Sequence, residues 1–304
     1  MSSLVSLLEE EKLAIETREK TLLIKSGNQK AQIKGLSTKD FPIIPQVSSD
    51  IWFEIDNNIL MDSINQVMDF CAITQIRPEL SGLYFSFQDK EVRIASTDSF
   101  RLAEKTIFLD QISAKPNTLT PFILPKNTAR EIINVFSGLG GKIKFTLSPS
   151  QIMIENLSEE NDQAKARLVS RLIDGDYPNY KEVIPKKFKT NIVLSKERFL
   201  NQIKTASLFS NQTNEIKLSI NPKNQKIIIF SQNSDLGESK SILSVKSKGE
   251  ETDVSFNHRF LTEGLNKLKG EEVSFELNGS GGPGLIRSNQ DNTYLYVIMP
   301  IKPN

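Results

Sequence analysis

A strand-then-helix pattern recurs four times along the chain and is the strongest regularity in the sequence. Each copy has a short apolar run, then a polar residue or a proline, then about three turns with helical spacing of apolar residues. The copies follow one another at intervals of roughly 65 residues and begin at Phe53, Phe122, Ile192 and Val254. A supersecondary unit repeated at so long a period predicts an array whose copies share a buried core.

Apolar spacing predicts the helices and strands of each copy. In the first copy, Leu60, Ile64, Val67 and Met68 share one face of a helix predicted over residues 59–70. Further apolar runs predict strands at 83–87, 91–96, 142–147, 151–157, 216–220, 226–232, 239–245 and 294–301. Because each helix must bury its apolar stripe on strands, we expect an α+β protein with helices on one face of antiparallel sheets.

Stretches with proline and glycine divide the chain. Residues 1–36 predict a short helical stretch and three strands, and the proline-containing residues 41–50 then predict a linker. A second linker is predicted at 170–185. We therefore expect an incomplete N-terminal piece, a middle domain and a C-terminal domain, with the bounds 1–47, 48–184 and 185–304.

Composition places the chain among globular proteins. It is 38% hydrophobic and 25% charged, and no apolar run approaches the roughly 20 residues that cross a bilayer. The N-terminus lacks the basic start of a signal peptide, and the single cysteine, Cys71, permits no internal disulfide. These features predict a cytoplasmic protein with no membrane partner.

The net charge of +1 means that any contact with nucleic acid requires local segregation of charge. The first repeat helix carries no base, but bases recur on or just after the other three: Lys126, Arg130, Lys196, Arg198, Lys204, Arg259, Lys267 and Lys269. For any single helix, a solvated face is enough to explain such basic residues. Their recurrence at equivalent places of a repeat favours a shared function.

Little in the sequence supports catalysis. His258, the only histidine, is typical of a surface or capping residue, and Cys71 at the end of an apolar stripe is typical of the core. Asp174 and Asp176 could suggest a metal site, but in a linker with glycine and proline they predict a turn. We therefore expect no enzyme, no cofactor and no metal, and a hydrolase that uses these two aspartates is the alternative from another class.

Two stretches mix apolar and polar residues in a way that is typical of binding surfaces. Residues 96–102 end a strand with a polar turn, which is followed by an aromatic residue, a cation and a leucine. Residues 297–301 place apolar side chains near the end of the chain, where Pro300 argues for a sheet edge and Met299 suits an adaptable groove.

At these residues the sequence resembles the bacterial DNA polymerase III beta subunit, the replication sliding clamp. The match is carried by STDSFRLA at 96–103, by SRLIDGDYPNYKEVIP at 170–185, and by FNHRFLTEGL at 256–265 with YLYVIMPIK at 294–302. The order and spacing of these motifs also fit, and the likeness runs from about residue 12 to residue 302.

The resemblance implies the DNA-clamp fold and a processivity factor without catalytic activity. Clamps of this family close around DNA as a homodimer, with helices that line the hole and sheets outside. The implied partners are double-stranded DNA, the DNA polymerase III catalytic subunit, the clamp loader, other replication and repair proteins with a clamp-binding peptide, and a second copy of the chain.

The resemblance also implies two sets of site residues. The family captures peptides with Gln and Leu or Phe anchors between its second and third domains, and the matching pocket residues here are Leu80, Thr97, Ser99, Phe100, Arg101, Leu102, Pro178, Val183, Asn257, Phe260, Val297, Ile298, Met299 and Pro300. The implied DNA-binding residues are Arg77, Lys126, Arg130, Lys196, Arg198, Lys204 and Lys267.

The sequence departs from the family pattern at several places. Ser99 and Phe100 replace the usual Gly-His, which predicts a reshaped pocket wall, and Glu182 stands where a basic residue is common. Ala31 occupies a strand position where some members carry an aromatic residue at the dimer contact. The first repeat of the N-terminal domain and the helix-bearing start of its second repeat are expected to be largely missing, so that residues 1–47 hold only the remainder. Two hypotheses therefore share the pocket: a clamp that closes around DNA, and an adaptor that binds peptides without a closed ring.

Overall fold

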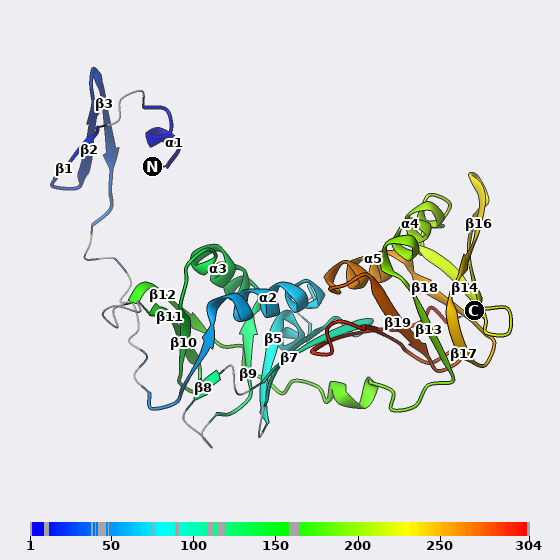
Figure 1. Ribbon diagram of the computed structural model, residues 1–304. Helices are drawn as coiled ribbons and strands as arrows, with labels where there is room; N and C mark the ends of the chain where they lie inside the picture. The colour runs from blue at the N-terminus through cyan, green and yellow to red at the C-terminus, as the bar shows by residue number, and fades with distance from the viewer. Residues whose placement is uncertain are drawn as a thin grey trace. The chain divides into compact units, whose positions relative to one another are not determined.

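The computed structural model divides the chain into two compact units, Met1–Gln46 and Val47–Asn304 (Figure 1). The residues that it describes are 2–8, 12–37, 39, 41, 47, 49–73, 76–88, 91–108, 112–114, 119–157 and 164–302. Most of the linker predicted at 41–50 lies outside these residues. The predicted bounds of three domains stay a prediction, and each unit is described by itself.

The first unit contains the short helix and the three strands that its sequence predicts. These elements are α1 (Ser2–Val5), β1 (Ala14–Arg18), β2 (Thr21–Ser26) and β3 (Gln29–Lys34). The strands form an antiparallel meander in the order β1-β2-β3. Ile24 in the central strand is 1% exposed.

The second unit begins with a middle segment, residues 49–171. Its elements are β4 (Trp52–Asp56), α2 (Asn57–Val67), η2 (Met68–Phe70), η3 (Pro78–Ser81), β5 (Gly82–Gln88), β6 (Glu91–Thr97), β7 (Arg101–Phe108), β8 (Ile112–Ala114), β9 (Phe122–Pro125), α3 (Lys126–Phe136), β10 (Lys142–Leu147), β11 (Gln151–Leu157) and β12 (Ala164–Arg171).

A linker, residues 172–189, leads to the C-terminal segment, residues 190–302. The linker contains the short helix η5 (Tyr180–Val183). The C-terminal elements are β13 (Thr190–Ser195), α4 (Lys196–Ser207), β14 (Glu215–Asn221), β15 (Lys226–Asn233), β16 (Gly237–Ser244), β17 (Lys246–Gly249), β18 (Thr252–Asn257), α5 (His258–Lys267), β19 (Glu272–Leu277), β20 (Gly284–Ser288) and β21 (Tyr294–Ile298).

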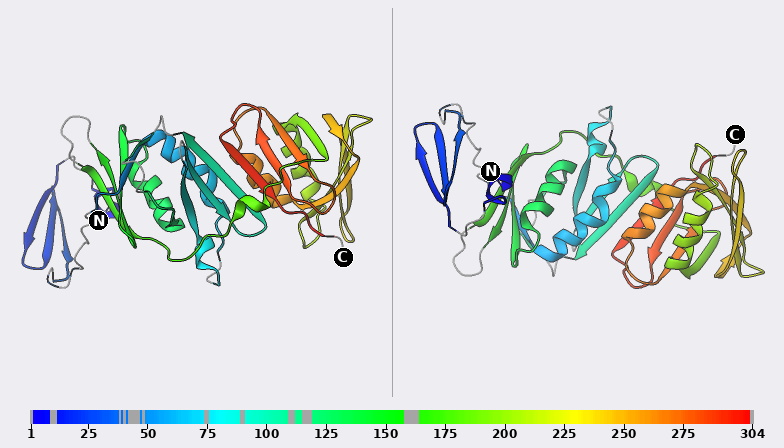
Figure 2. Two further views of the ribbon diagram at one scale, coloured as in Figure 1. Left: turned by 90° about the horizontal axis from the view of Figure 1, so that it is seen from below. Right: turned by 90° about the horizontal axis from the view of Figure 1, so that it is seen from above.

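Within the described residues, the second unit has three antiparallel sheets. Their strand orders are β12-β11-β10-β4-β8, β17-β13-β19-β20-β21-β7-β6-β5-β9 and β16-β15-β14-β18. Helices α2 to α5 lie on one side of these sheets (Figures 1 and 2). The predicted fold class, repeated strand-helix units with helices on one face of antiparallel sheets, is therefore confirmed.

Local chemistry starts each long helix immediately after a strand. The side chain of Asp56 accepts hydrogen bonds from the backbone N–H groups of Asn58 and Ile59 at the start of α2, at 2.9 and 3.2 Å. Ser195 and Asn257 cap α4 and α5 in the same way. Pro125 precedes α3, where a missing N–H costs nothing. The polar residue or proline of each repeat is thus the helix start.

Two predicted bounds are wrong. Ser170 and Arg171 belong to strand β12, so the second linker begins only at Leu172. Strand β21 ends at Ile298, although the apolar run continues to Ile301. Pro300 has no N–H to donate to a ladder, and beyond it only a single bridge forms, from the N–H of Ile301 to the carbonyl of Ser255 at 2.8 Å.

One pairing joins the middle and C-terminal segments into one sheet: β7 runs antiparallel to β21, with Leu102 opposite Val297. Alternate residues face opposite sides. Ala103 and Tyr296 lie in the main core under the helices, while Leu102 and Val297 lie in a smaller cluster with Tyr180 of the linker. We call this pairing the seam.

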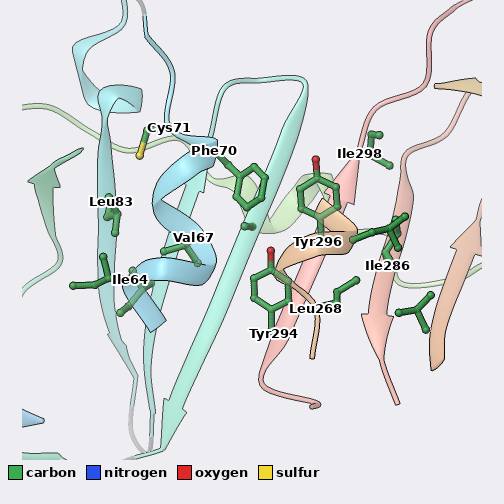
Figure 3. Packing of buried hydrophobic residues seen from close by; sticks show 14 of the residues in the cluster. Ile64, Val67, Phe70, Cys71, Leu83, Leu268, Ile286, Tyr294, Tyr296 and Ile298 are labelled. Atoms are coloured by element: carbon green, nitrogen blue, oxygen red, sulfur yellow. The ribbon is translucent and has the colours of Figure 1, made fainter. Parts of the chain in front are cut away.

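The main core continues across the seam. The rings of Phe70 and Tyr296 lie with centroids 5.0 Å apart, between the end of α2 and strand β21 (Figure 3). The hydroxyl of Tyr296 donates to the carbonyl of Phe260 at 2.9 Å. Helix α5 comes this close to β21 because Gly264, with no side chain, lies against the ring of Tyr296.

We predict that Gly264→Ala lowers the free energy of unfolding by about 1–3 kcal/mol. An added Cβ would lie 2.2–2.6 Å from three atoms of the Tyr296 ring, which outweighs the roughly 1 kcal/mol gained in helix propensity. Urea unfolding followed by circular dichroism measures the change. Gly140→Ala is the control, because a Cβ there meets nothing within 4 Å. Equal effects of the two substitutions would contradict this account of Gly264.

Candidate functional site

A cavity of about 210 Å³ lies at the end of the seam. We call it the seam pocket. It is lined by Arg77, Leu80, Thr97, Ser99, Arg101, Leu102, Pro178, Asn179, Tyr180, Val183, Val297 and Met299. These residues come from four separate stretches of sequence: the region around η3, the turn between β6 and β7, the linker, and the end of β21.

Hydrogen bonds fix the turn between β6 and β7. One carboxylate oxygen of Asp98 accepts from the backbone N–H groups of Phe100 and Arg101, both at 3.0 Å. The hydroxyl of Thr97 accepts from the N–H of Ser99 at 3.1 Å and donates to the carbonyl of Arg101 at 2.6 Å. Ser99, between them, has a φ of 78°. This is the left-handed region, which favours glycine.

The floor of the seam pocket is apolar. Leu80, Leu102 and Val297 are each at most 3% exposed. At the rim, Met299 and Val183 are 36% and 43% exposed. Large apolar side chains that are exposed beside a buried apolar floor favour the binding of an apolar group.

A charged residue forms one side of the seam pocket. The guanidinium of Arg101 contacts the carboxylate of Asp98 at 2.9 Å and that of Glu263 on α5, and it lies 4.4 Å from the ring centroid of Phe260. Burial would lower the pKa of Arg101, but the hydrogen bond to Glu263 and the nearby Asp98 outweigh burial and raise it. Arg101 therefore stays charged and ties the pocket to helix α5.

Three tyrosines form the wall between the linker and the sheet. The rings of Tyr84 and Tyr177 stack with centroids 4.6 Å apart, and Tyr180 meets both edge-on at 6.2 Å. The hydroxyl of Tyr180 donates to the buried carboxylate of Glu104. Burial raises the pKa of Tyr180 and the neighbouring Glu104 raises it further, so the hydroxyl keeps its proton.

The structure brings together most of the predicted pocket residues: Leu80, Thr97, Ser99, Arg101, Leu102, Pro178, Val183, Val297 and Met299 line the seam pocket. The other predicted residues lie elsewhere. Phe100 is 62% exposed, and its ring centroid lies 6.5 Å from that of Phe260. Asn257 caps α5. Ile298 is buried in the core, and Pro300 follows β21. Their binding roles stay predictions.

Three lining residues were not predicted for the pocket. Asn179 and Tyr180 belong to the linker motif at 170–185, so the sequence carried a signal for them. Arg77 was predicted to contact DNA, and here it lines the seam pocket and pairs with Glu79 at 2.9 Å.

The predicted DNA-binding bases differ in their surroundings. Arg130 on α3 and Arg198 and Lys204 on α4 are exposed, and Lys126 is half-buried.

Two other bases of this set make contacts inside the protein. The ammonium of Lys196 donates to the carbonyl of Leu268 at 2.9 Å. The ammonium of Lys267 contacts the carboxylate of Asp69 at 2.6 Å and the carbonyl of Asn65 at 2.7 Å. These two lysines tie elements together, and their contact with DNA stays a prediction.

The side chains that could act in catalysis or bind a metal have surroundings that are typical of structural residues. Cys71 is 3% exposed, and burial raises the pKa of its thiol to about 12. Burial lowers the pKa of His258, as does the neighbouring Arg259. Within the described ranges, no three side chains of His, Cys, Asp or Glu are placed to hold a metal ion. In the same residues, no helix is long and apolar enough to cross a bilayer.

Comparisons with known proteins agree with this architecture. The family model described as DNA polymerase III beta subunit, central domain, matches residues 54–179, and that of the C-terminal domain of the same subunit matches residues 181–302. The beta sliding clamp of Bacillus subtilis is 26% identical over 283 residues, which cover 92% of this chain and 72% of that protein. The beta sliding clamp of Synechococcus elongatus is 25% identical over 291 residues, 95% of this chain and 76% of that protein.

Solved structures give the same result. The crystal structure of the DNA polymerase sliding clamp from Bacillus subtilis matches with a TM-score of 0.90 at 26% identity, over 100% of this chain and 78% of that one. The DNA polymerase III beta subunit of Thermotoga maritima matches with a TM-score of 0.88 at 24% identity, over 99% and 79%. The chain belongs to the DNA polymerase III beta subunit family, the sliding clamps of DNA replication.

We predict that Ser99→Gly raises the free energy of unfolding by about 0.5–1 kcal/mol, because glycine adopts the left-handed φ of 78° without strain. Guanidinium unfolding of both proteins measures the difference. Ser280→Gly is the control, since Ser280 lies in an exposed turn and has no positive φ. There the greater freedom of the unfolded glycine chain should lower stability slightly. A loss of stability at both positions would show that Ser99 is not strained.

Proposed function

We propose that the chain is a processivity factor that encircles duplex DNA as a homodimer and tethers the DNA polymerase III catalytic subunit through the seam pocket. The observation that carries this proposal is the seam pocket itself, an open apolar cavity at the joint of the two family-matched segments. The clamp loader and other replication and repair proteins with a clamp-binding peptide would use the same pocket. The protein acts without catalysis.

The apolar floor of the seam pocket supports recognition of a peptide by its aliphatic or aromatic anchor. Leu102 and Val297 form a fixed floor, whereas Met299 and Val183 stand at the rim. Methionine has an unbranched chain that can adapt to different side chains, so it suits a pocket shared by several partners. Because the floor residues are already buried and packed against one another, binding requires little rearrangement.

The face formed by the helices supports contact with DNA. Arg130, Arg198 and Lys204 stand exposed on α3 and α4. Phosphate contacts by such residues are independent of sequence and weaken with salt, so they hold the duplex without fixing its position. A closed ring then supplies the tether. An adaptor without a closed ring would share the seam pocket, and no feature of the described residues favours it.

We predict that Met299→Ala weakens the binding of a peptide with Gln and Leu-Phe anchors about 5- to 30-fold, because the rim loses most of an apolar side chain. Fluorescence anisotropy with a labelled synthetic peptide measures the dissociation constant. Leu236→Ala is the matched control, because Leu236 is an apolar residue that is 64% exposed on the β15–β16 hairpin. Unchanged affinity in both Met299→Ala and Leu102→Ala would exclude the seam pocket as the peptide site.

We predict that the protein, once placed on circular duplex DNA by a clamp loader, stays bound through gel filtration and is released when the circle is cut. Topological tethering depends on closure of the ring and not on tight contacts, so linear DNA should lose the protein from its ends. The same linear DNA with both ends blocked by a bound protein is the control and should retain it. Release from intact circles would favour the adaptor.

A further inference from the structure

A second and larger cavity lies beside the linker, on the same unit as the seam pocket. Its volume is about 560 Å³, within the usual range for ligand sites. Tyr84, Tyr177, Asp174 and Asp176 are among the residues that line it. We call it the aspartate cavity.

The two cavities share a wall. Tyr84 and Tyr177 line the aspartate cavity, and Tyr180, which meets both rings edge-on, lines the seam pocket. Along the chain, Tyr177 lines one cavity and the next residue, Pro178, lines the other. Consecutive Cα atoms are about 3.8 Å apart. A partner segment of a few residues that leaves the seam pocket over this wall therefore reaches the aspartate cavity.

The charged residues of the two cavities differ. The seam pocket contains Arg77 and Arg101, and each is paired with a carboxylate. The aspartate cavity contains Asp174 and Asp176 and no basic residue. Both aspartates are exposed, and neither has an ion-pair partner among the residues that the structure describes.

Tyrosine residues beside unpaired carboxylates suit an organic cation. A lysine or arginine side chain is attracted by the face of a tyrosine ring and by a carboxylate, and its apolar stem can lie along the ring. A metal ion fits less well, because in the described chain no third acidic, histidine or cysteine side chain joins Asp174 and Asp176.

We propose that the aspartate cavity binds a lysine or arginine side chain of the partner peptide whose apolar anchor occupies the seam pocket. This inference rests on the proposed peptide-binding function and adds a specificity element to it. Partners with a basic residue near the anchor bind more tightly than partners without one. The preference weakens with salt, because both aspartates are exposed.

Three labelled synthetic peptides test this proposal by fluorescence anisotropy. All carry the same Gln and Leu-Phe anchors; one has two lysines before the anchors, one has two lysines after them, and one has glutamines at all four places. One lysine peptide should bind about three- to tenfold more tightly than the glutamine peptide at low salt. In the variant Asp174→Asn with Asp176→Asn, the three peptides should bind alike.

A matched control separates the effect of the two cavity aspartates from the effect of a lower overall negative charge of the protein. Asp235→Asn with Glu238→Gln removes the same charge from two exposed residues near the turn of the β15–β16 hairpin, and it should keep the lysine preference. A preference that survives in the Asp174 and Asp176 variant, or that is lost equally in the control variant, would overturn the proposal.

Met299→Ala distinguishes a failure of the aspartate cavity as a lysine subsite from a failure of the seam pocket as the peptide site. If this substitution weakens all three peptides but the wild-type protein shows no lysine preference, the aspartate cavity is not a subsite and the seam pocket remains the peptide site. If it weakens none of them, the peptide-binding function itself fails, and the inference that rests on it fails as well.

Discussion

The antiparallel pairing of β7 with β21 is the constraint on which the second unit depends, because it alone makes one sheet of two segments that are distant in the sequence. Its register is specified by buried charge as well as by apolar contacts. Lys105 contacts Asp291 at 3.1 Å and Thr293 at 2.6 Å, and Glu104 accepts from Tyr180. A slip by one residue would exchange the two faces of β7 and leave these charges buried without partners, which is costly.

Contacts hold the two segments together on both faces of the seam, and this explains why the seam pocket is ordered. On the helix face, the side chain of Gln66 donates to the carbonyl of Lys267 at 3.0 Å and the hydroxyl of Tyr294 donates to the carbonyl of Gln66 at 3.3 Å. On the opposite face, the linker packs through Tyr180 onto Leu102 and Val297. Rotation of one segment against the other would break contacts on both faces at once. The pocket floor is therefore held in place before any ligand arrives.

The sequence predicted the repeats well because their signals are local. A capping side chain such as Asp56 and an apolar stripe such as Leu60 and Ile64 act within a few residues of each other. The seam was not predicted from residue patterns, because the run RLAEKTIF of β7 places Glu104 and Lys105 at buried positions and so hides the alternation of a strand. The pocket was assembled only through the resemblance, since no local pattern brings the linker, β7 and β21 together.

The bases at equivalent positions of the repeats do not have equivalent surroundings, and those near the seam differ from the others. Lys267 occupies a repeat position that predicts a base facing DNA, yet its ammonium pairs with Asp69, and Lys269 pairs with Asp62. Asp69 of η2 and Asp62 of α2 thus pair with the bases at the end of α5 and just after it. By contrast, Arg130 on α3 and Arg198 and Lys204 on α4 are exposed. In the proposed clamp, a duplex that slides must not be held strongly at any one place. A lysine that is paired with a carboxylate binds phosphate less strongly, so the ion pairs that join the two segments also weaken contact with DNA there.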